Sequence, residues 1–124
     1  MVNPKVYVVN EPLRRDPQTG EMSRWMDLTP AAAFGELSFL LPAGHQPQDP
    51  SPVLEVLRRK LAGYRPHDYI LPLGDPALIG WAIALAARAA GGQVRTLCWI
   101  PKQKGYIVAK AELWVPDDEM VYGR

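Results

Sequence analysis

The sequence has little of the chemistry from which disulfides, metal sites and catalytic centres are built. Cys98 is the only cysteine among 124 residues, which excludes a disulfide within one chain and a cysteine-based zinc site. His45 and His67 are the only histidines, and neither lies at metal-ligand spacing from another ligand type. No serine, histidine and aspartate stand out as a nucleophilic set. We therefore predict no metal ion, no cofactor and no catalytic residue, and the sequence does not indicate an enzyme.

Long hydrophobic runs and an excess of one charge are absent as well. No apolar run reaches the ~18 residues of a membrane span, and Met1 is not followed by the basic and apolar regions of a signal peptide. We therefore expect a cytoplasmic protein with no membrane partner. Fourteen basic and thirteen acidic residues give a net charge of +1, so binding to nucleic acid would need a local basic patch. Thirteen prolines are compatible with a thermostable protein, because proline lowers the entropy of the unfolded chain.

The most informative stretch runs from Asp68 to Gly92 and predicts a strand, a turn and a buried helix. Tyr69–Leu71 reads as the strand, and the proline and glycine that follow it end the strand in a turn. Asp75 then has the position and chemistry of a helix N-cap, with Pro76 at the first helical position. The helix should end at the glycine pair 91–92, which can adopt the left-handed conformation of a C-cap.

This helix is apolar over more than half of its circumference and must be largely buried. Its remaining arc consists of small residues and one arginine. An exposed face is the simpler interpretation of that arc, and close packing against a second subunit in a homodimer is the alternative. The residues of the arc are Ala77, Gly80, Ala84, Ala87, Arg88 and Gly91.

Further strands and one amphipathic helix are predicted from periodicity and turn residues. Strands are expected at residues 5–9, 36–41, 94–100 and 106–115, and a helix that starts at Ser51 and Pro52 continues to Leu61. Residues 13–28 should form a surface excursion. In the last strand, one face is apolar and the other carries Lys110 and Glu112, so we expect this second face to be exposed to solvent at its middle. The apolar set comprises Ile107, Ala109, Ala111, Leu113 and Val115.

This order of elements predicts an α/β protein. We expect a small Rossmann-like three-layer sandwich with a mostly parallel sheet of about five strands and a C-terminal antiparallel β-hairpin. An α+β fold with mostly antiparallel strands is the alternative. Residues 1–115 should form one domain, and residues 116–124 an acidic C-terminal tail.

The loops at the carboxyl ends of the parallel strands are the candidate ligand site, because open parallel sheets bind ligands there. Asp75 would suit a ribose hydroxyl better than a phosphate, although a plain N-cap also explains it. No Gly-x-Gly-x-x-Gly motif or Walker lysine is present, so a nucleotide ligand is supported by topology alone. The candidate residues are Asn10, Glu11, Gly44, His45, Gln46, Gly74 and Asp75.

Two surfaces are candidates for binding a macromolecular partner. Arg14, Arg15 and Trp25 in the excursion could form a basic patch with an aromatic residue. The hairpin interleaves basic and aromatic side chains, which is the chemistry that single-stranded nucleic acid or an acidic protein surface requires. A solvated turn whose lysines protect a sheet edge is the plainer interpretation. The hairpin residues are Trp99, Lys102, Lys104, Tyr106 and Lys110.

Three stretches resemble small proteins encoded by tailed bacteriophages. They are VYVVNEPLRRDPQTGE, DYILPLGDPALIGWAIALAARAAGG and TLCWIPKQKGYIV, and the similarity covers most of the chain. The resemblance implies a virus-encoded protein in the cytoplasm of a host bacterium. It implies no activity and no catalytic residues.

From these observations we expect a small binding or regulatory protein that acts on a host macromolecule and forms a homodimer through the small-residue arc or an exposed sheet edge. Binding or sequestration of a nucleotide-like small molecule at the strand ends is the alternative. Binding of single-stranded nucleic acid by the hairpin comes third, and a hydrolase or transferase is a further alternative.

Overall fold

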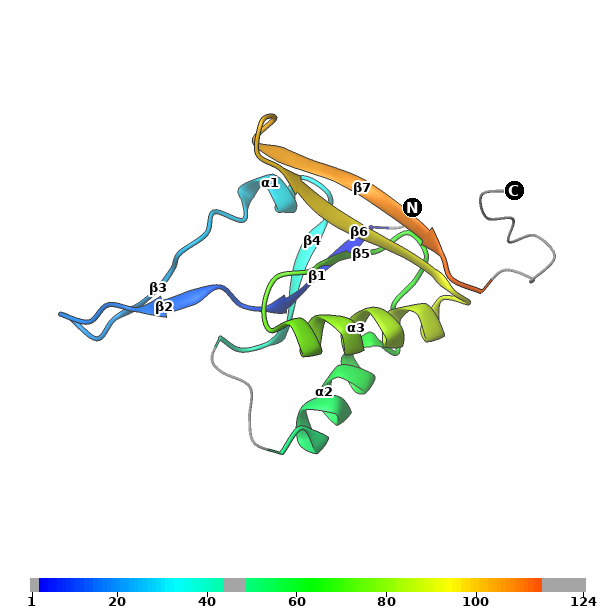
Figure 1. Cartoon of the computed structure of the whole chain (residues 1–124), viewed down its shortest axis with the longest axis horizontal. Coiled ribbons are helices and arrows are strands. Elements are labelled where there is room, and N and C mark those ends of the chain that lie inside the picture. Colours follow the sequence, from blue (N-terminus) through cyan, green and yellow to red (C-terminus); the bar gives the residue numbers. More distant parts are fainter. Residues whose placement is uncertain (1–2, 44–48, 115–124) are drawn as a thin grey trace, which may run out of the picture.

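A computed structural model describes residues 3–43 and 49–114 of the chain. The predicted acidic tail and three predicted ligand residues, Gly44, His45 and Gln46, lie outside these ranges. The described residues form a five-stranded sheet in the order β4-β1-β5-β6-β7 (Figure 1). Its strands are β1 (Lys5–Asn10), β4 (Glu36–Leu41), β5 (Tyr69–Leu71), β6 (Gln93–Ile100) and β7 (Gly105–Glu112).

The sheet is parallel except at its C-terminal edge. β1 pairs in parallel with both β4 and β5, and β5 pairs in parallel with β6. Only β7 runs antiparallel, as the second strand of a hairpin with β6. Val6, Val8 and Val9 of the central strand β1 are fully buried, as expected for a strand that packs on both faces. The α/β class, the mostly parallel sheet and the hairpin are thus confirmed.

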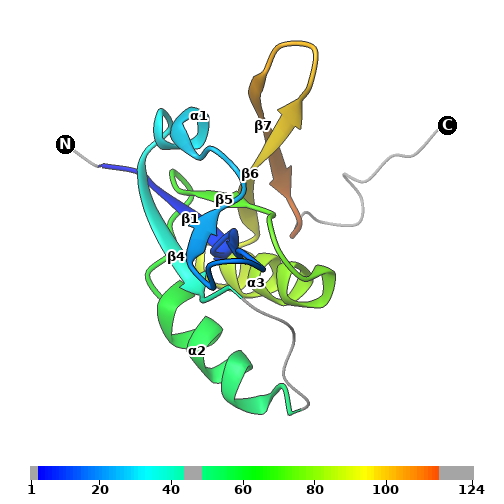
Figure 2. The ribbon, with the colours of Figure 1, turned by 90° about the vertical axis from the view of Figure 1, so that its left-hand side faces the viewer.

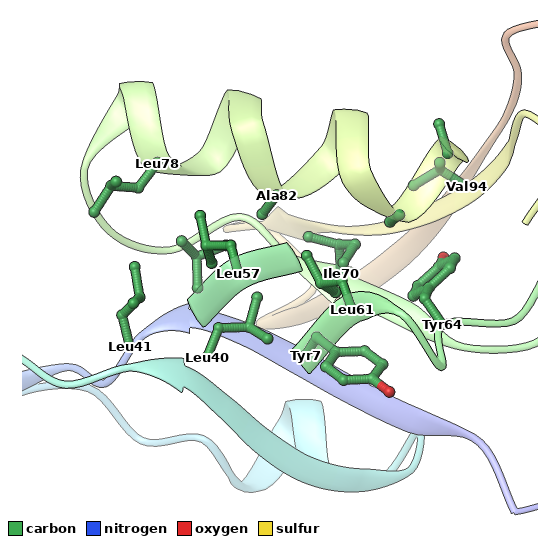
Figure 3. Packing of buried hydrophobic residues seen from close by; sticks show 13 residues of the cluster. Tyr7, Leu40, Leu41, Leu57, Leu61, Tyr64, Ile70, Leu78, Ala82 and Val94 are labelled. Carbon is green, nitrogen blue, oxygen red and sulfur yellow. The ribbon is translucent and has the colours of Figure 1, made fainter. Parts of the chain in front are cut away.

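Two helices cover one face of the sheet, α2 (Ser51–Leu61) and α3 (Pro76–Ala89) (Figure 2). Leu57 and Leu61 of α2 are completely buried, whereas its arginines and lysine are exposed. Tyr7 and Ile70 point from the sheet into the same cluster, together with Leu78 and Ala82 of α3 (Figure 3). This cluster is the main core of the protein. Its burial is the dominant favourable term in the stability of the fold.

Both ends of α3 follow the capping chemistry that the sequence predicts. One carboxylate oxygen of Asp75 accepts hydrogen bonds from the amides of Ala77 at 3.0 Å and Leu78 at 3.2 Å. At the other end Gly91 and Gly92 have φ values of 66° and 91°, and the Gly92 amide donates to the Ala87 carbonyl at 2.7 Å. This is the Schellman arrangement, so the chain turns directly from α3 into β6.

The opposite face of the sheet carries a much thinner layer. Its single helix, α1 (Thr29–Ala32), is four residues long. Around α1, partly buried aromatic and aliphatic side chains pack against buried Val6, Val8, Leu71 and Leu97. The third layer of the predicted sandwich is therefore one short helix and a set of side chains.

The burial pattern of β7 corrects the prediction for this strand. The set that begins with Ile107 and Ala109 was expected to form the buried face. Instead, Tyr106 and Val108 pack into the cluster beside α1, and Ile107 is 47% exposed. The register explains the difference, because Val108 lies opposite Leu97 of β6, which is 1% exposed. Residues directly opposite in an antiparallel pair share a face of the sheet, so the inner strand decides which face of β7 is buried.

The excursion contains a small two-stranded ribbon that the sequence analysis did not predict. β2 (Leu13–Arg15) pairs antiparallel with β3 (Met22–Arg24) outside the main sheet, and the ribbon projects away from it (Figure 1). Asp16 organises its turn by accepting from the amides of Gln18 at 2.7 Å and Thr19 at 3.4 Å. The Gly20 amide donates to the Asp16 carbonyl at 2.8 Å.

In the described ranges, no helix is both long and apolar enough to cross a membrane.

Candidate functional site

At the carboxyl ends of the strands, the structure brings four predicted ligand residues together. The Asn10 side chain accepts a hydrogen bond from the Asp75 amide at 3.1 Å and donates one to the Pro42 carbonyl at 3.2 Å. Gly74 has a φ of 136° and lies so close to Asn10 that a Cβ there would overlap the amide oxygen. Glu11 is anchored next to them by its amide, which donates to the Leu41 carbonyl at 3.0 Å.

These bonds give the strand-end residues a structural role. Asn10 joins the segment after β4 to the segment after β5, and the Asp75 carboxylate caps α3. The Asn10 amide and one Asp75 oxygen therefore already have partners within the chain. The predicted ligand site stays a prediction, and its Gly44–Gln46 half lies outside the described residues.

The base of the β2–β3 ribbon is fixed by Arg24. Its guanidinium lies 3.7 Å from the Glu11 carboxylate and 5.0 Å from the centre of the Phe39 ring. The next residue, Trp25, donates its amide to the Pro12 carbonyl at 3.1 Å. An ion pair, a cation–π contact and a main-chain bond together hold the ribbon against the sheet.

Beyond this base, the ribbon exposes the chemistry typical of protein-binding surfaces. Met22 is 48% exposed and Trp25 is 52% exposed, and Arg14 and Arg15 are exposed on β2. Arg15 lies opposite Met22, so these two side chains share one face of the ribbon. We call Arg14, Arg15, Met22 and Trp25 the ribbon surface. A hollow of about 450 Å³ adjoins it and is lined by Arg24, Trp25, Met26, Asp27, Leu28, Thr29, Ala32 and Leu37.

The predicted hairpin surface is divided between the two ends of the hairpin. Trp99 is 41% exposed and packs edge-to-face on Tyr106, with ring centres 5.1 Å apart, near exposed Lys102 and Lys104 in the turn. Lys110 lies four residues further along β7, about 13 Å away at the rise of a strand. The structure therefore brings four of the five predicted hairpin residues together and separates the fifth.

The sequence analysis missed the most highly organised polar cluster, which lies at the amino-terminal edge of the sheet. Asp68 is 3% exposed and is the buried polar residue of the described core. Its two oxygens accept hydrogen bonds from the amides of Lys5 and Arg65, each at 2.9 Å. His67 lies 3.5 Å from one of these oxygens. Residues that are far apart in sequence thus meet at one carboxylate.

Arg95 and Tyr64 extend this cluster to β6. The Tyr64 hydroxyl donates to the Asp68 carbonyl at 3.0 Å and accepts from the Arg95 amide at 3.2 Å. The Arg95 guanidinium donates to the carbonyls of His67 and Asp68 and lies 4.0 Å from the centre of the Tyr69 ring. An arginine within an otherwise apolar strand is the signal from which this cluster could have been found.

The electrostatics of the edge favour neutral tyrosines. Burial raises the pKa of Tyr7 and of Tyr64, and the negative charge of Asp68 raises both further. Burial also raises the pKa of Tyr106, whose hydroxyl has no hydrogen-bond partner within the described residues.

Two hollows of about 370 and 300 Å³ flank His67 at this edge. In residues 3–43 and 49–114, no three His, Cys, Asp or Glu side chains gather as a metal site would require.

We predict that Asn10→Ala lowers the free energy of unfolding by about 1–2 kcal/mol, because the substitution leaves the Asp75 amide without its acceptor. Urea unfolding measures this change. Asn3→Ala is the matched control, since Asn3 is the other asparagine and is exposed. Equal stability of the two variants would contradict the structural role of Asn10.

The raised tyrosine pKa values predict a loss of stability at alkaline pH. Tyr7, Tyr64 and Tyr106 keep their protons in the folded state above the ordinary pKa of 10.0. Their contribution to the free energy of unfolding is therefore fully present below pH 10. It is lost as the pH rises through the pKa values that these tyrosines have in the folded state. Absorbance of tyrosinate should show these groups titrating late, and Tyr64→Phe should remove one of them. A single titration of every tyrosine near pH 10 in the folded protein would refute this.

Comparisons with known proteins identify the family. Residues 4–113 match the family described as phage Pam3 gp32-like protein. No curated protein and no solved structure matches the chain. The match extends from the first residues of β1 past the end of β7 and includes the ribbon, both hairpin strands and the amino-terminal edge cluster. The chain therefore belongs to the phage Pam3 gp32-like protein family.

Proposed function

We propose that this phage protein is a non-enzymatic binding protein that captures an acidic macromolecular surface of the host through the ribbon surface. The observation that carries the proposal is the joint exposure of two arginines, a methionine and a tryptophan on one projecting ribbon. Arg15 and Met22 share one face of the ribbon, and Arg14 lies on the other face, opposite Ser23. Tryptophan, arginine and methionine are enriched in protein interfaces, and tryptophan and arginine dominate their binding energy. A half-exposed tryptophan contributes less to folding than a buried one.

The ribbon is ordered before any partner binds. Its turn is closed by Asp16, and the Glu21 amide donates to the Thr19 hydroxyl at 3.2 Å. Its base is held by Arg24 through Glu11 and Phe39. A preorganised surface loses less conformational entropy on binding than a flexible loop, so more of its contact energy becomes affinity.

The available charges indicate what kind of surface the partner presents. Arg24 is committed to Glu11, whereas no ion pair is formed by Arg14 or Arg15 with any residue the structure describes. Two free guanidinium groups favour carboxylates or phosphates, which they can bind through paired hydrogen bonds. Beside them, the exposed Trp25 side chain offers an apolar contact next to a hollow with polar and apolar lining residues. An acidic protein with an apolar side chain at its centre would match both features.

The other proposals from the sequence have weaker support. Nucleotide binding at the strand ends would have to compete with the internal hydrogen bonds of Asn10 and Asp75. Nucleic-acid binding by the hairpin would depend on Trp99, Lys102 and Lys104, because Lys110 lies at the other end of β7. The ribbon combines two exposed apolar side chains with two arginines that form no ion pair with the described residues.

The test compares variants of the two surfaces. We predict that Trp25→Ala and the double variant Arg14→Glu/Arg15→Glu each weaken capture of the host partner about 30-fold or more, as expected for a central tryptophan or a reversed charge pair. The double variant Lys102→Glu/Lys104→Glu changes charge equally at the hairpin and should leave capture intact. The partner is isolated from nuclease-treated host lysate with wild-type protein, and its affinity for each purified variant is then measured.

Thermal unfolding of each variant provides the folding control, since all five residues are exposed. Capture that survives Trp25→Ala, or that is lost only in the lysine variant, would contradict the ribbon as the binding surface. Loss of capture after nuclease treatment alone would indicate nucleic acid and would favour the hairpin proposal.

A further inference from the structure

The two edges of the sheet are protected unequally. At the β4 edge, the Lys60 ammonium of α2 donates to the carbonyls of Phe39 at 3.3 Å and Leu40 at 3.0 Å. At the other edge, β7 is eight residues long, and no part of the described chain hydrogen-bonds to its outer side. A long open edge is a template for another strand.

The register of the hairpin shows which main-chain groups are open. The Leu113 amide donates to the Gly92 carbonyl at 2.7 Å, which makes this pair a hydrogen-bonded position of the hairpin. Bonded and non-bonded pairs alternate along an antiparallel ladder. Lys110 and Glu112, which pair with Arg95 and Gln93, are therefore non-bonded positions within the chain. Their amides and carbonyls point outward, to the free side of β7.

The side chains of the same two residues carry opposite charges without partners. Lys110 and Glu112 are exposed, and neither forms an ion pair with any residue in the described ranges. Lys110 instead lies directly opposite Arg95, a like charge. A carboxylate placed on the outer side of Lys110 would compensate this row of positive charge.

We propose that β7 pairs antiparallel with β7 of a second copy of the chain, with Ala111 at the two-fold axis. Each Lys110 then lies opposite Glu112 of the second copy, and each such pair exchanges both of its main-chain hydrogen bonds. The two sheets join into one continuous sheet. An isologous two-fold interface repeats every contact, so the ion pair forms twice.

Other registers of the two β7 strands set like charges opposite each other or leave the charges unpaired. A two-fold axis at Lys110 would set two lysines opposite each other, and an axis at Glu112 would set two glutamates opposite each other, which is destabilising. An axis at Ala109 would place Lys110 opposite Val108 and leave the charges unpaired. The register centred on Ala111 alone pairs both.

The same register suits the neighbouring side chains. Ala111 meets its own copy at a non-bonded position, where Cα atoms approach to about 4.5 Å and small residues fit best. Ala109 lies opposite Leu113, which is 51% exposed in one chain, and Val108 opposite Trp114, which is 61% exposed. Gly92 leaves room for Trp114 at this end of the strand, because a Cβ at position 92 would come within 2.8 Å of the Trp114 side chain. Pairing would shield two large apolar residues flanking the ion pairs.

Charge reversal tests the register by sedimentation velocity and light scattering on the full chain. We expect a dimer for the wild type, and for Lys110→Glu and for Glu112→Lys a dissociation constant that rises roughly tenfold or more. The double variant Lys110→Glu/Glu112→Lys restores the dimer with the pairs reversed. Lys102→Glu makes the same charge change in the hairpin turn and should not affect dimerisation. The ribbon surface is untouched in all of these variants, so the outcome is independent of the proposed function.

A disulfide tests the geometry directly. In a Cys98→Ser background, Ala111→Cys should form a covalent dimer on oxidation, because position 111 faces its own copy, whereas Ala109→Cys should not. A wild type that stays monomeric at every concentration overturns the proposal. A dimer that tolerates both single charge reversals contradicts the proposed register. A dimer that is cross-linked through position 109 and not through position 111 contradicts it too.

Discussion

The fold depends on one buried carboxylate at the amino-terminal edge of the sheet. Asp68 receives the first amide of β1 and the amide of Arg65 in the segment that leads into β5. Its carbonyl also accepts from Tyr64 and Arg95, which adds β6 to the same point. A buried charge without such partners would cost several kcal/mol. The three inner strands of a parallel sheet, which no short hairpin can align, are thus aligned at their starts by polar contacts.

Asn10, the last residue of β1, links the carboxyl ends of β1, β4 and β5. It joins the segment after β4 to the Asp75 cap of α3, and Gly74 provides the space for its amide. Internal hydrogen bonds of Asn10 and of one Asp75 oxygen thus occupy part of the edge at which α/β proteins commonly bind ligands. Exposed chemistry lies instead on two additions to the sheet, the β2–β3 ribbon and the β6–β7 hairpin. This distribution is the basis on which we propose a macromolecular partner and not a small-molecule ligand at the strand ends.

Local rules predicted the parts of the fold that local chemistry decides. The Asp75–Pro76 start of α3, its double-glycine end and the strands between turn residues follow from neighbours in sequence. The Asp68 cluster did not follow, because Asp68 lies 63 positions from Lys5 and 27 from Arg95, and only the sheet register brings them together. The prediction of which face of β7 is buried was wrong for a related reason. Both faces of that strand carry apolar residues, and only its pairing with Leu97 of β6 decides which face is buried.

The two sheet edges show how the same physics leads to opposite results. On β4, a lysine from a neighbouring helix bonds to the strand carbonyls and removes them as acceptors. On β7, the lysine belongs to the strand itself, and a lone lysine there would oppose pairing with any identical strand. Glu112, two positions later on the same face, changes that outcome, because an antiparallel copy centred between them meets each charge with its opposite. In the dimer that we propose, the β7 edge is therefore selective, because like charges oppose pairing in the two adjacent registers and opposite charges favour it in one.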